Sequence, residues 1–92
     1  MTMPLIVGNW KMTLLTAEAA ELALAVKEFL EQNTGVSVIL APSFTLLHSV
    51  NHTLSGSRVR LASQNFYFER KGAYTGEVSV EMLKSIGIET VI

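Results

Sequence analysis

Short apolar runs that alternate with longer amphipathic segments set the strongest limit on what this chain can fold into. The runs are residues 5–7, 36–40, 59–62 and 90–92, and the second of them is apolar at every position of its centre. Continuous apolarity is typical of a strand covered on both faces, as in a parallel sheet. The runs begin roughly 20 to 30 residues apart, which suits successive right-handed βαβ units. The pattern predicts an α/β fold in the order β-α-β-α-β-loop-α-β.

Three amphipathic segments between these runs predict the helices. The first has Thr16 as its N-cap and ends at residues 33–35, the second begins near Ser43, and the third is capped by Ser79. Their apolar faces follow helical spacing and comprise Ala19, Leu22, Ala23, Val26, Phe29 and Leu30, then Phe44, Leu47, Val50 and Leu54, then Val80, Leu83 and Ile86.

Composition narrows the classes of function. The 92 residues suffice for one small domain, and a formal charge of −1 gives no electrostatic reason to expect nucleic acid or an anionic membrane as a partner. The absence of Cys and Asp excludes disulfides, thiolate chemistry and Ser-His-Asp triads. With no signal-peptide pattern and no apolar stretch of membrane-spanning length, the sequence predicts a soluble, intracellular protein.

The fraction of charged residues is low for so small a chain. Charged residues make up 16% of the sequence, whereas a typical globular domain is about a quarter charged. A small domain has more surface per volume and should need more charge. We therefore expect a partner, or further chain, to cover part of the surface.

The ends of the predicted strands supply the candidate site, because parallel α/β folds gather function at the carboxyl ends of strands. Asn9 and Lys11 follow the first run, Ser43 the second, and Gln64 and Asn65 the third. Among these residues Lys11 carries the charge. It is suited to an anionic or carbonyl-bearing ligand, and the alternative is a solvated surface lysine.

Two further patterns favour ordinary structural interpretations. His48 and His52 have a spacing that can hold a metal, but no Cys or Asp exists to complete a ligand set, which favours a solvated helix and no metal site. Residues 51–53 match a glycosylation sequon, which carries no weight without a secretory signal.

Residues 65–77 form an unusually long connection with four aromatic side chains, interrupted by Gly72 and Gly76. Four aromatic residues in one loop are poorly explained by exposure to solvent. Either the loop folds back on its own domain as a satellite cluster, or it inserts into another chain. The residues alone leave both interpretations open.

Four motifs, in order along the whole chain, resemble those of the triosephosphate isomerase family. Residues 8–12 (Gly-Asn-Trp-Lys-Met) are similar to its N-terminal active-site motif, and residues 41–44 (Ala-Pro-Ser-Phe) to its second loop. Gln-Asn at 64–65 and Gly-Ala-Tyr-Thr-Gly-Glu at 72–77 resemble its long third loop. The chain departs from the family pattern at Thr13, often Asn, and at Val80, commonly Pro; neither position touches the chemistry.

The resemblance implies that residues 1–92 are the first half of a (β/α)8 barrel, ending within the fourth strand. It also implies the interconversion of glyceraldehyde 3-phosphate and dihydroxyacetone phosphate through an enediolate, in glycolysis and gluconeogenesis in the cytoplasm, with no cofactor and no metal. Lys11 would be catalytic and would bind substrate, with Asn9 as the second substrate-binding residue. The family's catalytic His and Glu match no residue of this chain, so the resemblance implies that the 92 residues alone are inactive.

The resemblance further implies a homodimer in which the 65–77 loop enters the partner subunit. The interface residues would be Gln64, Asn65, Tyr74, Thr75, Gly76 and Glu77. The alternative to an isomerase is a non-catalytic interaction module, a half-barrel that pairs with itself or with a complementary fragment.

Overall fold

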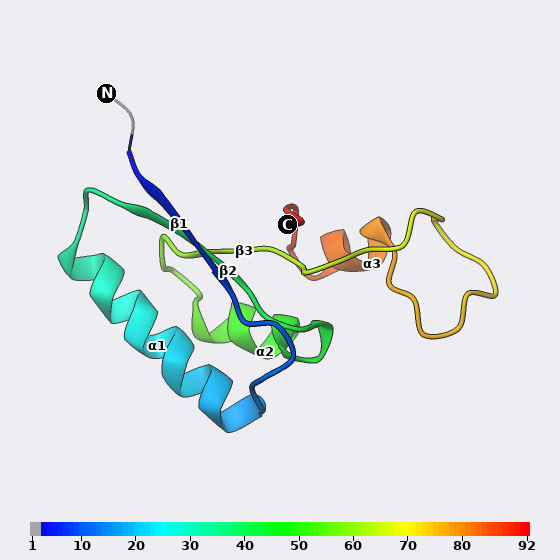
Figure 1. Cartoon of the computed structure of the whole chain (residues 1–92), viewed down its shortest axis with the longest axis horizontal. Coiled ribbons are helices and arrows are strands. Elements are labelled where there is room, and N and C mark those ends of the chain that lie inside the picture. The colour runs from blue at the N-terminus through cyan, green and yellow to red at the C-terminus, as the bar shows by residue number, and fades with distance from the viewer. Residues whose placement is uncertain (1–2) are drawn as a thin grey trace.

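The computed structural model describes residues 3–92, which form one parallel sheet flanked by helices (Figure 1). The elements are β1 (Leu5–Asn9), α1 (Thr16–Gln32), β2 (Ser37–Ala41), α2 (Phe44–Thr53), β3 (Arg60–Leu61) and α3 (Val80–Ser85). The strands lie side by side in the order β1-β2-β3, and both pairings are parallel. The predicted α/β alternation is confirmed.

The register of the strands fixes which side chains share a face. Val7 lies opposite Ile39, and Ile39 lies opposite Arg60. Asn9 lies opposite Ala41 at the carboxyl end of the same pair. Because successive side chains of a strand point to opposite faces, Val7, Asn9 and Ile39 share one face.

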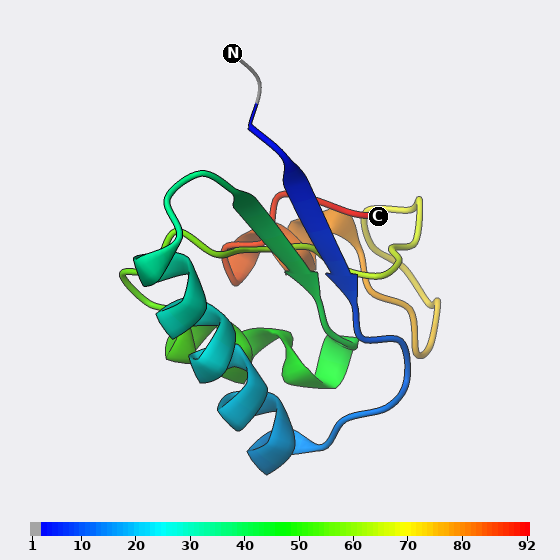
Figure 2. The same ribbon diagram turned by 60° about the vertical axis from the view of Figure 1, so that its left-hand side comes forward.

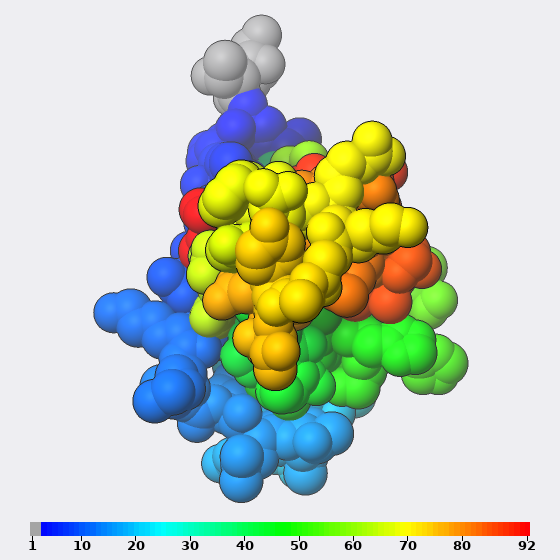
Figure 3. Space-filling model, turned by 90° about the vertical axis from the view of Figure 1, so that its right-hand side faces the viewer, coloured from blue at the N-terminus to red at the C-terminus, as the bar shows by residue number. Residues whose placement is uncertain are grey.

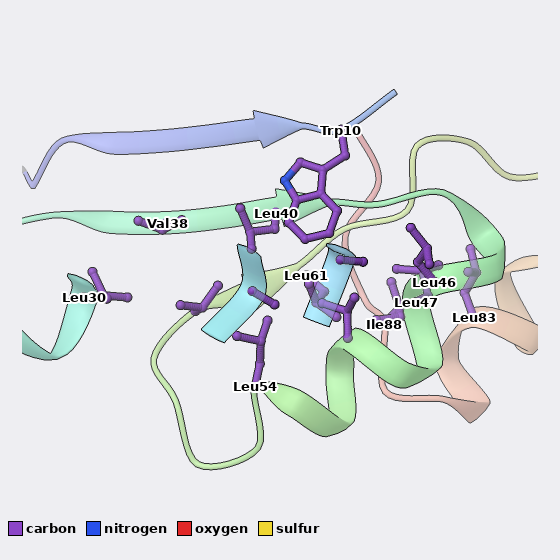
Figure 4. Packing of buried hydrophobic residues seen from close by; sticks show 14 residues of the cluster. Trp10, Leu30, Val38, Leu40, Leu46, Leu47, Leu54, Leu61, Leu83 and Ile88 are labelled. Atoms are coloured by element: carbon purple, nitrogen blue, oxygen red, sulfur yellow. The ribbon is translucent and has the colours of Figure 1, made fainter. Parts of the chain in front are cut away.

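Helices α1 and α2 cover the same face of the sheet (Figures 1 and 2). The main core fills the space between these helices and the sheet. Figure 4 shows Trp10 and Leu40 from the sheet side meeting Leu47 and Leu54 from the helix side. Burying a large aliphatic side chain contributes roughly 1.5 to 3 kcal/mol. This cluster is the larger of the two buried hydrophobic clusters in residues 3–92.

The other face of the sheet is only thinly covered. Ile39, Ala41 and Ala62 form a small buried cluster there. On β1, at the edge of the sheet, Leu5 and Val7 point to this face and remain 52% and 45% exposed. This face of the sheet therefore carries exposed aliphatic side chains.

Helix α1 differs from its predicted outline at both ends. Leu15 occupies the N-cap position that Thr16 was expected to hold, and its backbone N–H donates to Glu18 Oε1 at 3.3 Å. A glutamate that reaches back to the N-cap amide replaces the hydroxyl cap. At the far end, the Arg58 guanidinium donates to the Leu30 carbonyl, which supplies positive charge where the helix sequence has none.

The apolar face of α1 is only partly covered by α2 and the sheet. Ala19, Ala23 and Leu30 are buried as predicted, whereas Leu22 and Phe29 are exposed. The buried positions face α2 and the sheet, while the exposed pair lies on the flank of the helix. The prediction that all six apolar residues pack inward was wrong for these two.

The later elements match their predictions in part. Ser43 is the N-cap of α2, but Phe44 is partly exposed and Leu46 takes the buried position beside Leu47. Ser79 caps α3 as predicted, with its hydroxyl oxygen accepting from the Met82 N–H at 3.2 Å.

The fourth apolar run forms a single bridge rather than a strand. Ser63 pairs in parallel with Val91, its N–H donates to the Thr90 carbonyl at 2.9 Å, and its carbonyl accepts from Ile92 N–H at 3.1 Å. The run does lie next to β3, as the predicted element order requires. None of the helices within residues 3–92 is long and apolar enough to cross a membrane.

Candidate active site

The carboxyl ends of the strands meet at one edge of the sheet and bring the predicted residues together. Asn9 ends β1, Ala41 ends β2, and Gln64 follows β3 after Ala62 and Ser63. The Trp10 N–H donates to the Ala41 carbonyl at 3.1 Å, so the chain leaving β1 stays attached to β2. Asn9 and Lys11, predicted from sequence as a pair, both lie exposed at this edge.

Lys11 has an unusual backbone conformation. Its φ is +53°, and among residues 3–92 it is the one non-glycine residue with a positive φ. This left-handed conformation costs an L-residue roughly 1 to 2 kcal/mol. The Asn9 side chain offsets part of that cost, because Asn9 Oδ1 accepts a hydrogen bond from the Lys11 N–H at 2.9 Å. Such strain is found where the surrounding structure fixes a residue for a function.

Gln64 holds the other side of the Lys11 turn. Its Nε2 donates to the Lys11 carbonyl at 2.8 Å and to the Ala41 carbonyl at 2.8 Å. One amide group therefore connects the segments that follow β1, β2 and β3. Thr13 adds a further bond, because its Oγ1 donates to the Trp10 carbonyl at 2.6 Å. The sequence placed Gln64 at a dimer interface, and nothing in it indicated these bonds to backbone carbonyls.

The arrangement is suited to binding an anion. The Lys11 ammonium is a positive point charge at an open rim, and no carboxylate among the described residues forms an ion pair with it. Asn9 adds a neutral amide beside it. Ser43 also follows a predicted strand, but its hydroxyl forms a 3.2 Å hydrogen bond with Thr45 Oγ1. Lys11 and Asn9 are thus the groups free to meet a ligand.

The two histidines lie away from this chemistry. His48 and His52 are exposed on α2. Within the described part of the chain, no group of three or more His or Glu side chains is placed to hold a metal ion. The Asn51 side chain of the sequon is used within the fold, where its Nδ2 donates to the Ile86 carbonyl at 3.0 Å.

The 65–77 loop is held by contacts among its own aromatic residues and by an ion pair from Arg70 to Glu81 of α3 at 3.0 Å. The Tyr67 ring packs against Phe68 and Tyr74, with centroids 4.7 and 4.8 Å apart. The Tyr67 N–H donates to the Val78 carbonyl at 2.7 Å, which closes the base of the loop. A Cβ on Gly72 would lie 2.7 Å from the Tyr74 ring, so the packing there needs glycine. Tyr67, Phe68 and Tyr74 thus form an aromatic cluster within the loop itself.

The rest of the loop remains available to another surface. It projects from the body of the molecule beside α3 in Figure 1, and Figure 3 looks onto it from that side, where it lies in front of the other elements. Phe68 is 76% exposed, and Thr75, Gly76 and Glu77 are exposed at the turn. A hollow of about 120 Å³ lies inside the loop, lined in part by Tyr67 and Glu77.

The comparison with protein families decides the ancestry of this fold. The family model for triosephosphate isomerase matches residues 4–92. The chain belongs to the triosephosphate isomerase family. Among curated relatives, the triosephosphate isomerase of Alkaliphilus oremlandii is 44% identical over all 92 residues, and that of Treponema denticola is 46% identical over 87 residues, or 95% of this chain.

A solved triosephosphate isomerase shares the fold as well. The crystal structure of the enzyme from Bartonella henselae superposes on 98% of this chain with a TM-score of 0.81 and 33% sequence identity. In that triosephosphate isomerase, as in the Alkaliphilus oremlandii relative, the matched region is 37% of the length. The 92 residues thus span a little over a third of such proteins, and they form part of a TIM barrel.

Proposed function

We propose that this chain supplies the lysine-bearing part of a triosephosphate isomerase active site. The reaction interconverts glyceraldehyde 3-phosphate and dihydroxyacetone phosphate by proton transfer through an enediolate, in glycolysis and gluconeogenesis in the cytoplasm, without a cofactor. The observation that carries the proposal is the strained, hydrogen-bonded Lys11 at the strand ends of a chain that belongs to this family.

Lys11 is the catalytic and substrate-binding residue of this part of the site. Its ammonium meets the substrate phosphate and the negative charge that develops on the enediolate. A fixed cation stabilises such charge more than mobile water does, because it does not have to reorient during the reaction. The bonds from Asn9 and Gln64 to the Lys11 backbone provide that fixed placement.

Asn9 has two tasks in the proposed site. Its Oδ1 holds the Lys11 N–H at 2.9 Å, which leaves the Nδ2 hydrogens for a substrate oxygen. A single side chain thus orients both the lysine and the substrate.

These 92 residues do not complete the site. The family's electrophilic His and its Glu base match no residue of this chain: His48 and His52 are exposed on α2, and Glu77 lies in the 65–77 loop. Turnover therefore requires residues from a further segment of polypeptide. We expect the 92 residues alone to be inactive.

The 65–77 loop serves a homodimer in this proposal. Its internal packing fixes the loop shape before docking, which lowers the entropy lost on association. The interface is formed by Gln64, Asn65, Tyr74, Thr75, Gly76 and Glu77.

The second candidate function is a non-catalytic half-barrel that pairs with itself or with a complementary fragment. The half-exposed Leu5, Ile6 and Val7 of the edge strand favour it, because an exposed apolar edge is a template for association. It differs from the isomerase proposal in one measurable respect: the paired form has no turnover.

The test uses a joined protein, in which these 92 residues replace the matched segment of the Alkaliphilus oremlandii isomerase and the rest of that enzyme follows. Lys11→Met keeps the aliphatic stem and removes the charge. We expect kcat/KM to fall about 100- to 1,000-fold, the usual effect of removing one electrostatic stabiliser. Lys84→Met, on the exposed end of α3, is the matched control and should keep normal turnover.

Lys11→Arg separates charge from geometry. Arginine keeps the positive charge but places it on a longer, planar group, so partial activity is expected. Near-normal turnover in the folded Lys11→Met protein would contradict the proposed role of Lys11.

A further inference from the structure

Gln64 makes contacts that a residue of a dimer interface has no need to make. Its side chain donates two hydrogen bonds, both from Nε2 to backbone carbonyls of the same chain, Lys11 and Ala41, each at 2.8 Å. The residue is half-buried, and its bonds link positions far apart in the sequence. They converge on the turn that carries the strained Lys11.

The two carbonyls explain why the side chain must be an amide of this length. Two acceptor oxygens face the same nitrogen, so the group between them has to supply two donors. A carboxylate would bring acceptors against acceptors, and an apolar side chain would leave the carbonyls without these partners. Asparagine carries the same amide on a side chain one methylene shorter.

We propose that Gln64 is a positioning residue, which holds Lys11 in its left-handed conformation and so aims the ammonium at the substrate. The proposal rests on the proposed function, in which Lys11 acts on an anionic triose phosphate. Gln64 itself touches no substrate and acts through the Lys11 backbone. Its place at the root of the 65–77 loop also joins the placement of Lys11 to that loop.

The kinetic test is a double-mutant cycle in the joined protein. Gln64→Met alone should lower kcat/KM by about 10- to 100-fold, because a displacement near 1 Å can cost that much. In the Lys11→Met background the same change should cost less than about threefold, since the residue it positions has lost its charge. Gln32→Met, at the exposed end of α1, is the matched control and should change neither background.

Two kinetic results would overturn the inference. One is a loss below about twofold in the Gln64→Met protein. The other is an equal fold-loss in kcat/KM in both backgrounds. The effects of two independent residues multiply, whereas a residue that acts only through Lys11 has little further effect once the Lys11 charge is gone. Gln64→Asn should lose as much activity as Gln64→Met, because its shorter side chain does not reach both carbonyls. Full activity in Gln64→Asn would contradict the proposed need for both hydrogen bonds.

A second measurement does not depend on turnover. Trypsin cleaves after lysine when the backbone can open, so its cleavage rate at Lys11 reports how firmly that turn is held. In Gln64→Met the rate at Lys11 should rise at least about fivefold while the rate at Lys84 stays constant. An unchanged rate at Lys11, or an equal rise at both sites, would show that Gln64 does not specifically hold this turn.

The two readouts separate the two proposals. If the folded joined protein lacks isomerase activity, the proposed function fails, and the trypsin result still decides whether Gln64 holds Lys11. If the joined protein is active but Gln64→Met leaves both kinetics and cleavage unchanged, the positioning role alone fails.

Discussion

The short turn at residues 9–13 and the long loop at residues 65–77 both leave the carboxyl end of a strand, but they are held in different ways. The short turn is fixed by bonds to other segments: Ala41 at the end of β2 accepts from the Trp10 N–H, and Gln64 after β3 donates to the Lys11 carbonyl. The long loop is held by the Tyr67–Tyr74 ring contact, by the bond that closes its base and by an exposed ion pair from Arg70 to Glu81 of α3 at 3.0 Å.

The difference indicates two purposes. A turn tied to the sheet on two sides has a position set by the rigid part of the fold, which suits a catalytic group. A loop that packs its own aromatic rings and projects from the body of the molecule has a set shape and an open outer surface (Figure 1). That arrangement suits docking against another surface. The predictions below change one region at a time.

Charging the tip of the long loop should have the largest effect. Thr75→Glu places a carboxylate on an exposed position of the proposed interface and leaves the Tyr67–Tyr74 contact intact. Burying an unpaired charge should weaken dimerisation of the joined protein at least about 100-fold. Analytical ultracentrifugation measures the monomer fraction. Thr16→Glu, an equal change on exposed α1, should leave the dimer intact, and a Thr75→Glu dimer of normal affinity would refute the interface.

The second-largest effect is expected from adding a methyl group inside the long loop. Gly72→Ala directs a Cβ to 2.7 Å from the Tyr74 ring at a φ of +148°, so the ring has to move. We expect a loss of about 2 kcal/mol in the free energy of unfolding, measured by urea denaturation. Gly35→Ala, where no heavy atom lies within 4 Å, should cost far less. Equal stability of the two variants would argue against the aromatic packing.

Removing one hydrogen bond from the short turn should have a smaller effect. Thr13→Val keeps the side-chain shape and deletes the 2.6 Å bond to the Trp10 carbonyl. A loss of about 1 kcal/mol is expected, as for a typical hydrogen bond. Denaturation of Thr13→Val beside Thr13→Ser separates the hydroxyl from the methyl group. If Thr13→Val matches the parent in stability, the turn does not depend on that bond.

The smallest effect is predicted for a residue at the root of the long loop, and it is a gain in stability rather than a loss. Ser63 is fully buried, and its Oγ has no hydrogen-bond partner among residues 3–92. Ser63→Ala removes an uncompensated polar atom and should raise the free energy of unfolding by about 0.5 to 1 kcal/mol. Loss of stability in this variant would show that the hydroxyl is bonded in solution.

The sequence predicted the order of elements better than their exposed faces. Continuous apolarity identified β2, and helical spacing identified Ala19, Ala23 and Leu30 as buried. Leu22 and Phe29 follow the same spacing but lie exposed, because periodicity records which side is apolar and not what is present to cover it. The same reason applies to Phe44 and to the half-exposed β1.

At the site, the sequence predicted which side chains gather but not how they are held. Asn9 and Lys11 follow from the rule that strand ends meet at one edge. The positive φ of Lys11 and the bonds of Gln64 do not follow from it, because their partners are backbone groups that every residue has. A long-range bond to a carbonyl leaves no pattern in the chain.

The most direct test of the account is an isomerase assay of the 92-residue chain, the remaining segment of the Alkaliphilus oremlandii enzyme, and the joined protein. Each is also examined by size-exclusion chromatography. We expect turnover of glyceraldehyde 3-phosphate in the joined protein and none in either part. A folded joined protein without activity, together with a stable, inactive self-dimer of the 92-residue chain, would contradict the isomerase proposal and support the interaction module.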